Sequence, residues 1–140
     1  MNEFLTELKK YGAVFLPRAA GEIVRTQAAL QASGKIMMPR GLVEFYENAG
    51  GMVLGDAEIF GLLPAAVGKT RARTLMETNG DFSNTPQLAK KTIFGRNGLF
   101  LLVVGEDLKY SLLDFYTMRP VKAYDDALAA IRDCLLVGAM

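Results

Sequence analysis

The chain contains no histidine and no tryptophan among its 140 residues, and it has a single cysteine. Without histidine it lacks the usual general base near neutral pH, every serine–histidine or cysteine–histidine nucleophile pair, and most ligand sets for transition metals. The lone Cys134 has no second cysteine for an internal disulfide. We expect it to be a buried, unreactive thiol on the apolar face of the last helix.

Long hydrophobic runs and a strong charge of either sign are also missing. The run from Leu99 to Val104 is far shorter than the roughly 20 apolar residues of a membrane helix. Glu3, Glu7, Lys9 and Lys10 interrupt the region where a signal peptide would be apolar, so we expect a cytoplasmic protein. A net charge of +1 creates no basic field for phosphate backbones. We therefore expect neither a membrane nor a nucleic-acid partner.

The composition that remains is that of a globular protein, with 51% hydrophobic and 22% charged residues. A chain of this length fits one domain, which can bury about two-thirds of its unfolded surface without metals or disulfides. We expect a single domain over residues 1–140, with a leading helix and an extended segment at 1–17 and the core at 18–138.

The stretch from residue 39 to residue 61 is the one around which the other elements are expected to pack. Apolar residues recur at helical spacing from Leu42 to Ala49, which predicts an amphipathic helix from about Pro39 to Ala49. Gly50 is expected to close this helix in the left-handed conformation. Two short strands separated by a tight turn are expected next, at 52–54 and 59–60.

The remaining elements complete an α+β prediction. Further helices are expected at 2–11, 19–32 and 66–77, and a last helix is expected with Asp125 as its cap. The second half predicts an antiparallel meander at 92–94, 99–104 and 110–115, followed by an edge strand at 119–122. Because 99–104 is apolar throughout, we expect it to be the central strand. The predicted architecture has helices packed on one side of a mixed, mostly antiparallel sheet.

Few motifs in the sequence point to catalysis. Gly68-Lys69-Thr70 matches the end of a phosphate-binding loop, but Leu63 occupies the position where that loop needs a glycine. The carboxylate pairs Glu106-Asp107 and Asp125-Asp126 fall where a turn and a helix N-terminus favour acidic residues. We therefore predict no catalytic, cofactor-binding or metal-binding residue.

Positive charge is concentrated in the polar segment between residues 61 and 96. It comes from Arg71, Arg73, Lys90, Lys91 and Arg96. No aromatic residues alternate with these side chains as stacking platforms for bases, and acidic residues interrupt them. The pattern favours a solvated loop surface or the rim of a face that binds an acidic protein.

A family resemblance makes the functional expectation more specific. A Pro-x-x-Leu-x-x-Phe/Tyr helix that ends in Asn-x-Gly-Gly, followed by a hairpin closing in Phe-Gly, resembles the SUKH superfamily. The matching residues are Pro39, Leu42, Phe45, Tyr46, Asn48, Gly50, Gly51, Phe60 and Gly61. The order of the later elements also fits, so the resemblance covers roughly residues 22–136. The chain departs from many members of the family in having no tryptophan.

The resemblance implies a bacterial immunity protein. SUKH domains occur widely in bacteria beside secreted polymorphic toxins, often nucleases or deaminases, and neutralise the toxin by binding it. Under this hypothesis the chain is a non-enzymatic protein-binding domain that stays in the cytoplasm of the producing cell. Two alternatives stay open: a housekeeping scaffold or regulator that binds a cellular protein, and a small-molecule binder or enzyme with a carboxylate–lysine site.

The expected contact surface lies in the polar segment and the neighbouring turns. The residues expected to bind the partner are Arg71, Arg73, Leu75, Glu77, Asp81, Phe82, Glu106 and Asp107. The charged members would tune partner choice and association rate, while Leu75 and Phe82 would act as apolar anchors.

Overall fold

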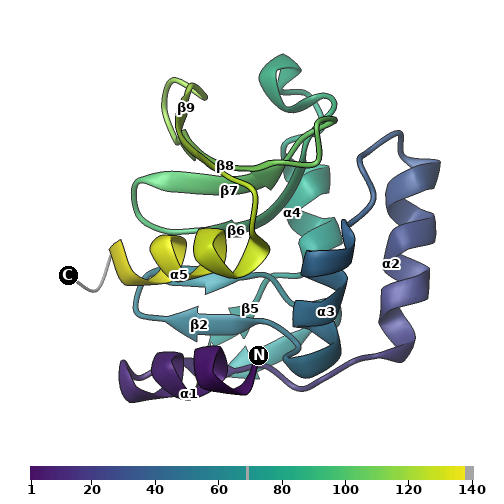
Figure 1. Cartoon of the computed structure of the whole chain (residues 1–140). Helices are drawn as coiled ribbons and strands as arrows, with labels where there is room; N and C mark the ends of the chain where they lie inside the picture. The colour runs from purple at the N-terminus through teal and green to yellow at the C-terminus, as the bar shows by residue number, and fades with distance from the viewer. Residues whose placement is uncertain (69, 138–140) are drawn as a thin grey trace.

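The computed structural model describes residues 1–68 and 70–137 (Figure 1). Its helices are α1 (Asn2–Lys10), α2 (Gly21–Ala32), α3 (Arg40–Asn48), α4 (Leu75–Asp81), the 3₁₀-helix η1 (Pro86–Leu88) and α5 (Ala127–Val137). Its strands are β1 (Val14–Phe15), β2 (Met52–Leu54), β3 (Ala57–Ile59), β4 (Ala65–Val67), β5 (Thr70–Ala72), β6 (Thr92–Arg96), β7 (Phe100–Val104), β8 (Tyr110–Asp114) and β9 (Pro120–Tyr124). The chain therefore has the α+β fold that the sequence predicts.

The main sheet has the strand order β1-β2-β3-β6-β7-β8-β9, and every neighbouring pair in it is antiparallel. β4 and β5 form a separate two-stranded hairpin. The predicted meander is confirmed as β6, β7 and β8, and the predicted edge strand as β9. β7 was predicted to be the central strand, and it is an interior strand whose residues Leu101–Val104 are buried. The middle position of the sheet, however, is occupied by β6.

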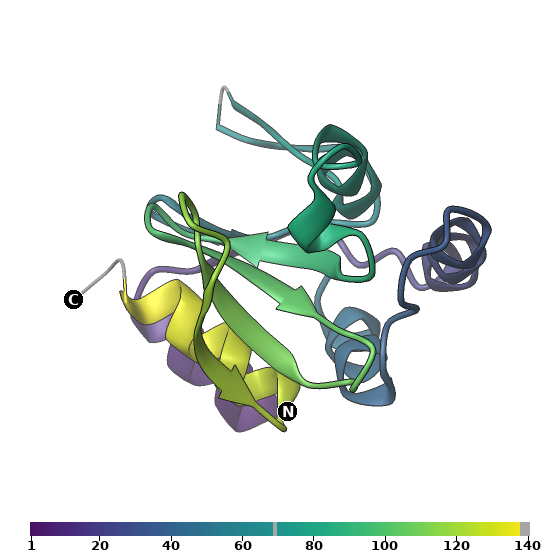
Figure 2. The same cartoon turned by 90° about the horizontal axis from the view of Figure 1, so that it is seen from above.

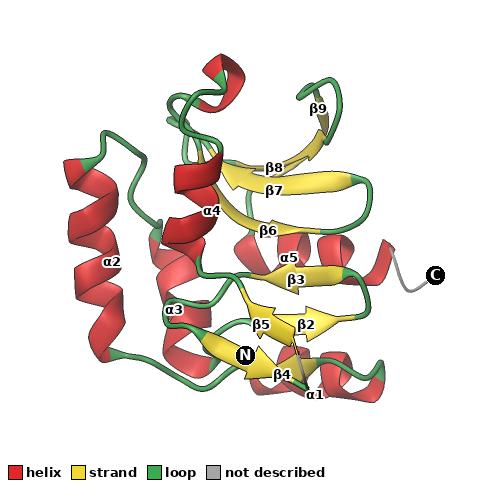
Figure 3. Cartoon of the chain, turned by 180° about the vertical axis from the view of Figure 1, so that it is seen from behind, coloured by secondary structure: helices red, strands yellow, loops and turns green. Residues whose placement is uncertain are grey.

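The two faces of the sheet are covered by different elements. Helix α5 lies across one face, with α1 beside it and α3 packed against it (Figure 2). Helix α4 and the β4–β5 hairpin lie on the other face, which is turned toward the viewer in Figure 3. The expected helical layer is thus present on one side, and the polar segment after residue 61 covers part of the second side.

Helix α3 is joined to the sheet by the aromatic residues that its sequence pattern predicts to be buried. Phe45 and Tyr46 meet edge to face at 5.2 Å between ring centroids. The Tyr46 hydroxyl donates a 2.6 Å hydrogen bond to the carbonyl oxygen of Phe60, just after β3. Complete burial raises the pKa of Tyr46 far above its ordinary value, so the hydroxyl stays protonated as a donor.

Three local predictions are wrong. Residues 66–77 do not form one helix, because Gly68 adopts a φ of +61° at the turn between β4 and β5, and α4 begins only at Leu75. Gly50 does not end α3 in a left-handed conformation, since the positive φ, +125°, belongs to Gly51. The cap of α5 is Asp126 rather than Asp125, because the Asp126 carboxylate accepts the Ala129 N–H at 3.2 Å.

Candidate functional site

The start of helix α4 is fixed by a reciprocal cap. The Glu77 backbone N–H donates to the Thr74 hydroxyl at 3.1 Å, and the Thr74 N–H donates to the Glu77 carboxylate at 3.3 Å. Thr-x-x-Glu is the sequence signature of this capping box. The cap holds Glu77 at the surface beside β5, where Arg71 can reach it.

Asn79 attaches the inner side of α4 to the sheet. Its side-chain amide donates to the carbonyl oxygens of Leu75 and Ile93, both at 2.8 Å, and its oxygen accepts the Ile93 N–H at 2.9 Å. The side chain is buried, so these bonds satisfy backbone groups that water does not reach. Asn79 therefore sets the position of α4 over β6.

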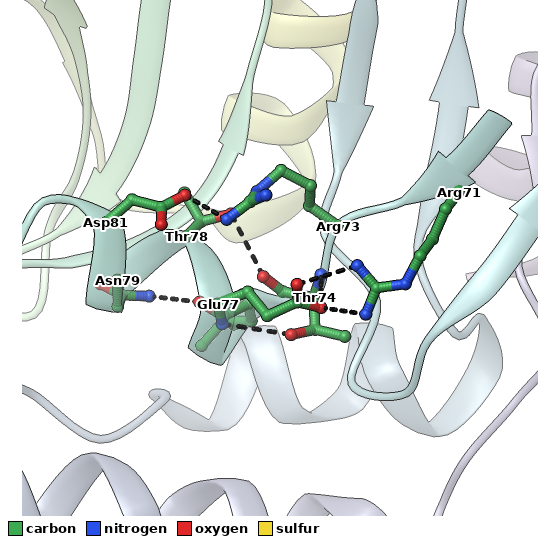
Figure 4. A network of polar contacts seen from close by, with 8 residues as sticks. Arg71, Arg73, Thr74, Glu77, Thr78, Asn79 and Asp81 are labelled. Carbon is green, nitrogen blue, oxygen red and sulfur yellow. Dashed lines mark hydrogen bonds and ion pairs between the residues drawn. The ribbon is translucent and has the colours of Figure 1, made fainter.

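Two ion pairs join β5 and its extension to α4 (Figure 4). The Arg71 guanidinium donates two hydrogen bonds to Glu77, at 2.9 and 2.8 Å, and Arg73 forms an ion pair with Asp81. The Arg71 hydrogen bond lowers the pKa of the Glu77 carboxyl to about 2. These contacts form a charged rim over the sheet.

Three adjoining cavities lie between this rim and the ends of strands β3, β6 and β8, and we call them together the central groove. The first, of about 270 Å³, has mostly apolar walls and includes Phe60, Leu101, Phe82 and Phe115. The second, of about 420 Å³, opens toward the turns at 55–56 and 97–98 and is also lined by Tyr116. The third, of about 310 Å³, lies under the β4–β5 hairpin.

Arg96 lines all three cavities, and Glu58 lines the second and the third. The two residues are paired across β3 and β6, so their side chains share the groove face, with Arg96 Nη2 lying 3.8 Å from Glu58 Oε2. Burial raises the pKa of Glu58, while the positive charges of Arg96 and Arg73 act in the opposite direction. A half-buried ion pair at the junction of cavities is a feature that functional sites often share.

A hydrogen-bonded turn after β8 presents an exposed tyrosine beside the groove. The backbone N–H groups of Tyr116 and Thr117 both donate to the Asp114 carboxylate at 2.9 Å, which lowers the pKa of Asp114. Met118 completes the turn with a φ of +59°. Tyr116 is 87% exposed, and its ring meets Phe115 edge to face at 5.7 Å. The turn therefore holds a large aromatic side chain in solvent at the groove's edge.

The structure brings together part of the predicted contact set. Arg73, Asp81 and Phe82 line the first cavity, Arg71 lines the third, and Glu77 pairs with Arg71. Leu75 was wrong as a surface anchor, because its side chain is 0% exposed in the core beneath α4.

Two predicted acidic residues do not line the central groove. Glu106 and Asp107 follow β7, at the end of the strand opposite to the Leu101–Arg96 pair. Glu106 lies 3.9 Å from Lys90, and Asp107 accepts the Lys109 N–H within its own turn at 3.1 Å. Neither residue lines a cavity of the central groove.

Sequence reasoning missed Glu58, Phe60, Phe115 and Tyr116 as groove residues. Glu58 carried a signal, because a carboxylate inside a short apolar strand has to be paired or exposed. The aromatic groove residues carried none, because Phe60 and Phe115 come from strand ends that only the sheet order brings together.

The Gly-Lys-Thr motif does not have the surroundings of a phosphate-binding loop. Lys69 of the Gly-Lys-Thr motif lies outside the described residues, and the chain on either side forms antiparallel strands rather than a strand leading into a helix. Across residues 1–68 and 70–137, no group of three or more acidic or cysteine side chains has a geometry that could hold a metal ion. Within the same ranges no helix combines the length and apolarity needed to cross a bilayer.

Comparison with protein-family models, with curated proteins and with solved structures found no match for this chain.

Proposed function

We propose that the protein is a non-enzymatic protein-binding domain and that the central groove, with its rim, is the surface that contacts the partner. The observation that carries the proposal is that Phe82 and Phe115 line the first cavity together with the Arg73–Asp81 ion pair. Exposed Tyr116 lines the adjoining second cavity. Tight protein interfaces characteristically combine aromatic anchors with a charged, solvated rim.

The partner we propose is a bacterial polymorphic toxin of the nuclease or deaminase type, which the protein neutralises by binding in the cytoplasm. The support is the resemblance to the SUKH superfamily carried by residues 39–61. The order of helix α3, hairpin β2–β3, the β6–β8 meander and closing helix α5 agrees with the order that the resemblance implies.

The experiment is an affinity capture of the tagged protein from its source cells, read by mass spectrometry. The test variant is Arg73→Glu/Tyr116→Ala, which changes one arginine of the rim and the exposed aromatic side chain. The matched control is Arg25→Glu/Tyr11→Ala, because Arg25 is likewise an exposed arginine paired with a carboxylate and Tyr11 is an exposed tyrosine.

We expect capture of a toxin that the control retains and the test variant loses, and we expect co-expression of the wild-type protein to restore growth to cells that make this toxin. Circular dichroism of both variants establishes that they are folded. A partner that the folded test variant still binds would show that the groove is not the contact surface. Recovery of a housekeeping protein, with no rescue from any toxin, would replace the immunity role by a scaffold role.

A further inference from the structure

The third cavity of the central groove has an excess of positive charge. Arg71, Arg73 and Arg96 line it, whereas Glu58 is the carboxylate in its lining. Arg71 and Arg73 each bind a carboxylate of α4, Glu77 and Asp81, which flank this cavity without lining it. The charge inside the cavity therefore favours an anionic occupant.

Among the three arginines that line this cavity, Arg96 is the one whose hydrogen-bonding capacity is least used. Its Nη2 atom lies 3.8 Å from Glu58, which is beyond hydrogen-bond distance, whereas Arg71 donates two bonds of less than 3 Å to Glu77. A guanidinium carries five N–H donors in a planar fork that matches a carboxylate. The Arg96 side chain is 45% exposed, so a group entering from solvent can reach these donors.

Glu58 does not occupy the donors of Arg96. It is 16% exposed and lies beside Arg96 on the neighbouring strand, so it offsets the charge of the guanidinium without bonding to it. A second carboxylate that approached from the open side would form the charge-assisted pair that Glu58 leaves unmade.

The rest of the cavity wall is aliphatic. Val53, Val67 and Ala72 line it together with the arginines. Such walls suit the methylene stem of an acidic side chain better than a hydrated inorganic ion, which has no apolar part to bury.

We propose that the third cavity binds the side-chain carboxylate of an acidic residue on a loop of the partner protein, with Arg96 as the principal donor. The inference rests on the proposed function and deepens it, because it assigns a chemistry to the partner's contact residue. Arg73 and Arg71 add long-range attraction and keep their bonds to α4. The negative charge of Glu58 opposes the approach of the incoming carboxylate.

The test uses two peptides that differ only in charge, acetyl-Leu-Glu-Leu-amide and acetyl-Leu-Gln-Leu-amide, titrated into the full chain and followed by NMR. We expect the glutamate peptide to shift the Arg96 side-chain N–H signal and the backbone signals of Ala72 and Arg73. We expect it to bind at least about fivefold more tightly than the glutamine peptide, as the loss of a charge-assisted hydrogen bond predicts.

Variants separate the roles of the two charges. Arg96→Gln is expected to lower the affinity for the glutamate peptide at least about fivefold. The exposed control Arg25→Gln should leave this affinity unchanged. Glu58→Gln is expected to strengthen binding of the same peptide, because it removes a negative charge that repels the peptide carboxylate and keeps the size of the side chain. An unspecific loss of fold would weaken binding in both groove variants, so opposite signs identify the mechanism.

Several results would overturn the inference. These are equal binding of the two peptides, shifts that map away from the cavity, no binding of either peptide at its solubility limit, or unchanged affinity in Arg96→Gln. Inorganic phosphate that binds the same residues more tightly than the glutamate peptide would replace the acidic loop by a phosphate ligand. If the capture experiment recovers a toxin but these peptides fail, the carboxylate inference alone is wrong; if the peptides bind and no protein is captured, the proposed function alone is wrong.

Discussion

Gly50 shows how a single residue fixes the path of the chain near the start of the sheet. Its N–H donates to the Leu16 carbonyl at 3.2 Å, and the Leu16 N–H donates to the Gly51 carbonyl at 3.0 Å, so the segment before α2 is bound against the glycine pair. A Cβ atom at Gly50 would lie 1.8 Å from the carbonyl oxygen of Pro17. Glycine is required there by close backbone approach, not by a left-handed helix end.

Gly50→Ala is therefore expected to destabilise the fold by about 3 kcal/mol or more, because the clash is with backbone and no side-chain rotation relieves it. The measurement is the urea unfolding midpoint of the variant against the wild type. The control is Gly80→Ala in α4, where nothing lies within 4 Å of the added Cβ, and it should be neutral or stabilising by up to about 1 kcal/mol. Equal midpoints for Gly50→Ala and the wild type would show that the segment at Leu16–Pro17 moves aside without cost.

Helix α4 depends on its contacts more than on its own sequence. It has 7 residues, fewer than an isolated helix needs to be stable in water. The capping box at Thr74 and Glu77 satisfies its first turn, and Asn79 binds it to β6 at Ile93. The position of the groove's rim therefore depends on these hydrogen bonds.

Asn79→Ala is expected to lower the free energy of unfolding by about 1–3 kcal/mol, because it leaves the buried N–H and C=O of Ile93 without the side-chain amide that pairs with them. Amide hydrogen exchange should show faster exchange at Ile93 and through α4, together with a lower urea midpoint. Asn84→Ala is the matched control, because Asn84 is exposed and its replacement should change neither quantity. Unchanged protection at Ile93 in Asn79→Ala would mean that α4 is positioned by packing alone.

Elements whose signals are local could be predicted from the sequence, and those decided by tertiary contacts could not. The β6–β7 hairpin was predictable from Asn97-Gly98, and the structure shows why: the Asn97 side chain accepts the N–H groups of Leu99 and Phe100, both at 2.8 Å. Thr74 and Glu77 also carried a local signal, a capping box that marks a helix starting at Leu75, but the sequence analysis placed the helix at 66–77.

The groove itself is a tertiary feature. Glu58, Arg96 and Phe115 lie far apart in the chain and meet because β3 pairs with β6 and β6 leads through β7 to β8. Leu75 was predicted as an apolar anchor for the partner, yet its side chain is buried in the core beneath α4. The sequence therefore identified the segment that forms the rim, but not which of its residues face solvent and which face the core.

The molecule as a whole is held together by α5 crossing the main sheet. Small side chains, Ala127 and Ala130, let the helix approach closely, and Ile131, Cys134 and Leu135 complete its buried face. The Asn97 side chain also donates to the Cys134 carbonyl at 3.0 Å, which connects the β6–β7 turn to the helix. Since α5 packs against both halves of the sheet, its detachment would expose most of the core at once, as expected for two-state unfolding.

Cys134 reports on this cooperativity because it is the single cysteine of the chain and its side chain is 0% exposed. Burial raises the pKa of its thiol to about 12, so the reactive thiolate forms only when the helix has left the sheet. We expect labelling by a thiol reagent at pH 8 to be slow, with an opening free energy equal to the free energy of unfolding from urea titration. Ser33→Cys in a Cys134→Ala background, at an exposed position, should label at the rate of a free peptide. Labelling of native Cys134 with an opening free energy well below that of global unfolding would show instead that α5 detaches on its own, and that the core consists of two separately stable parts.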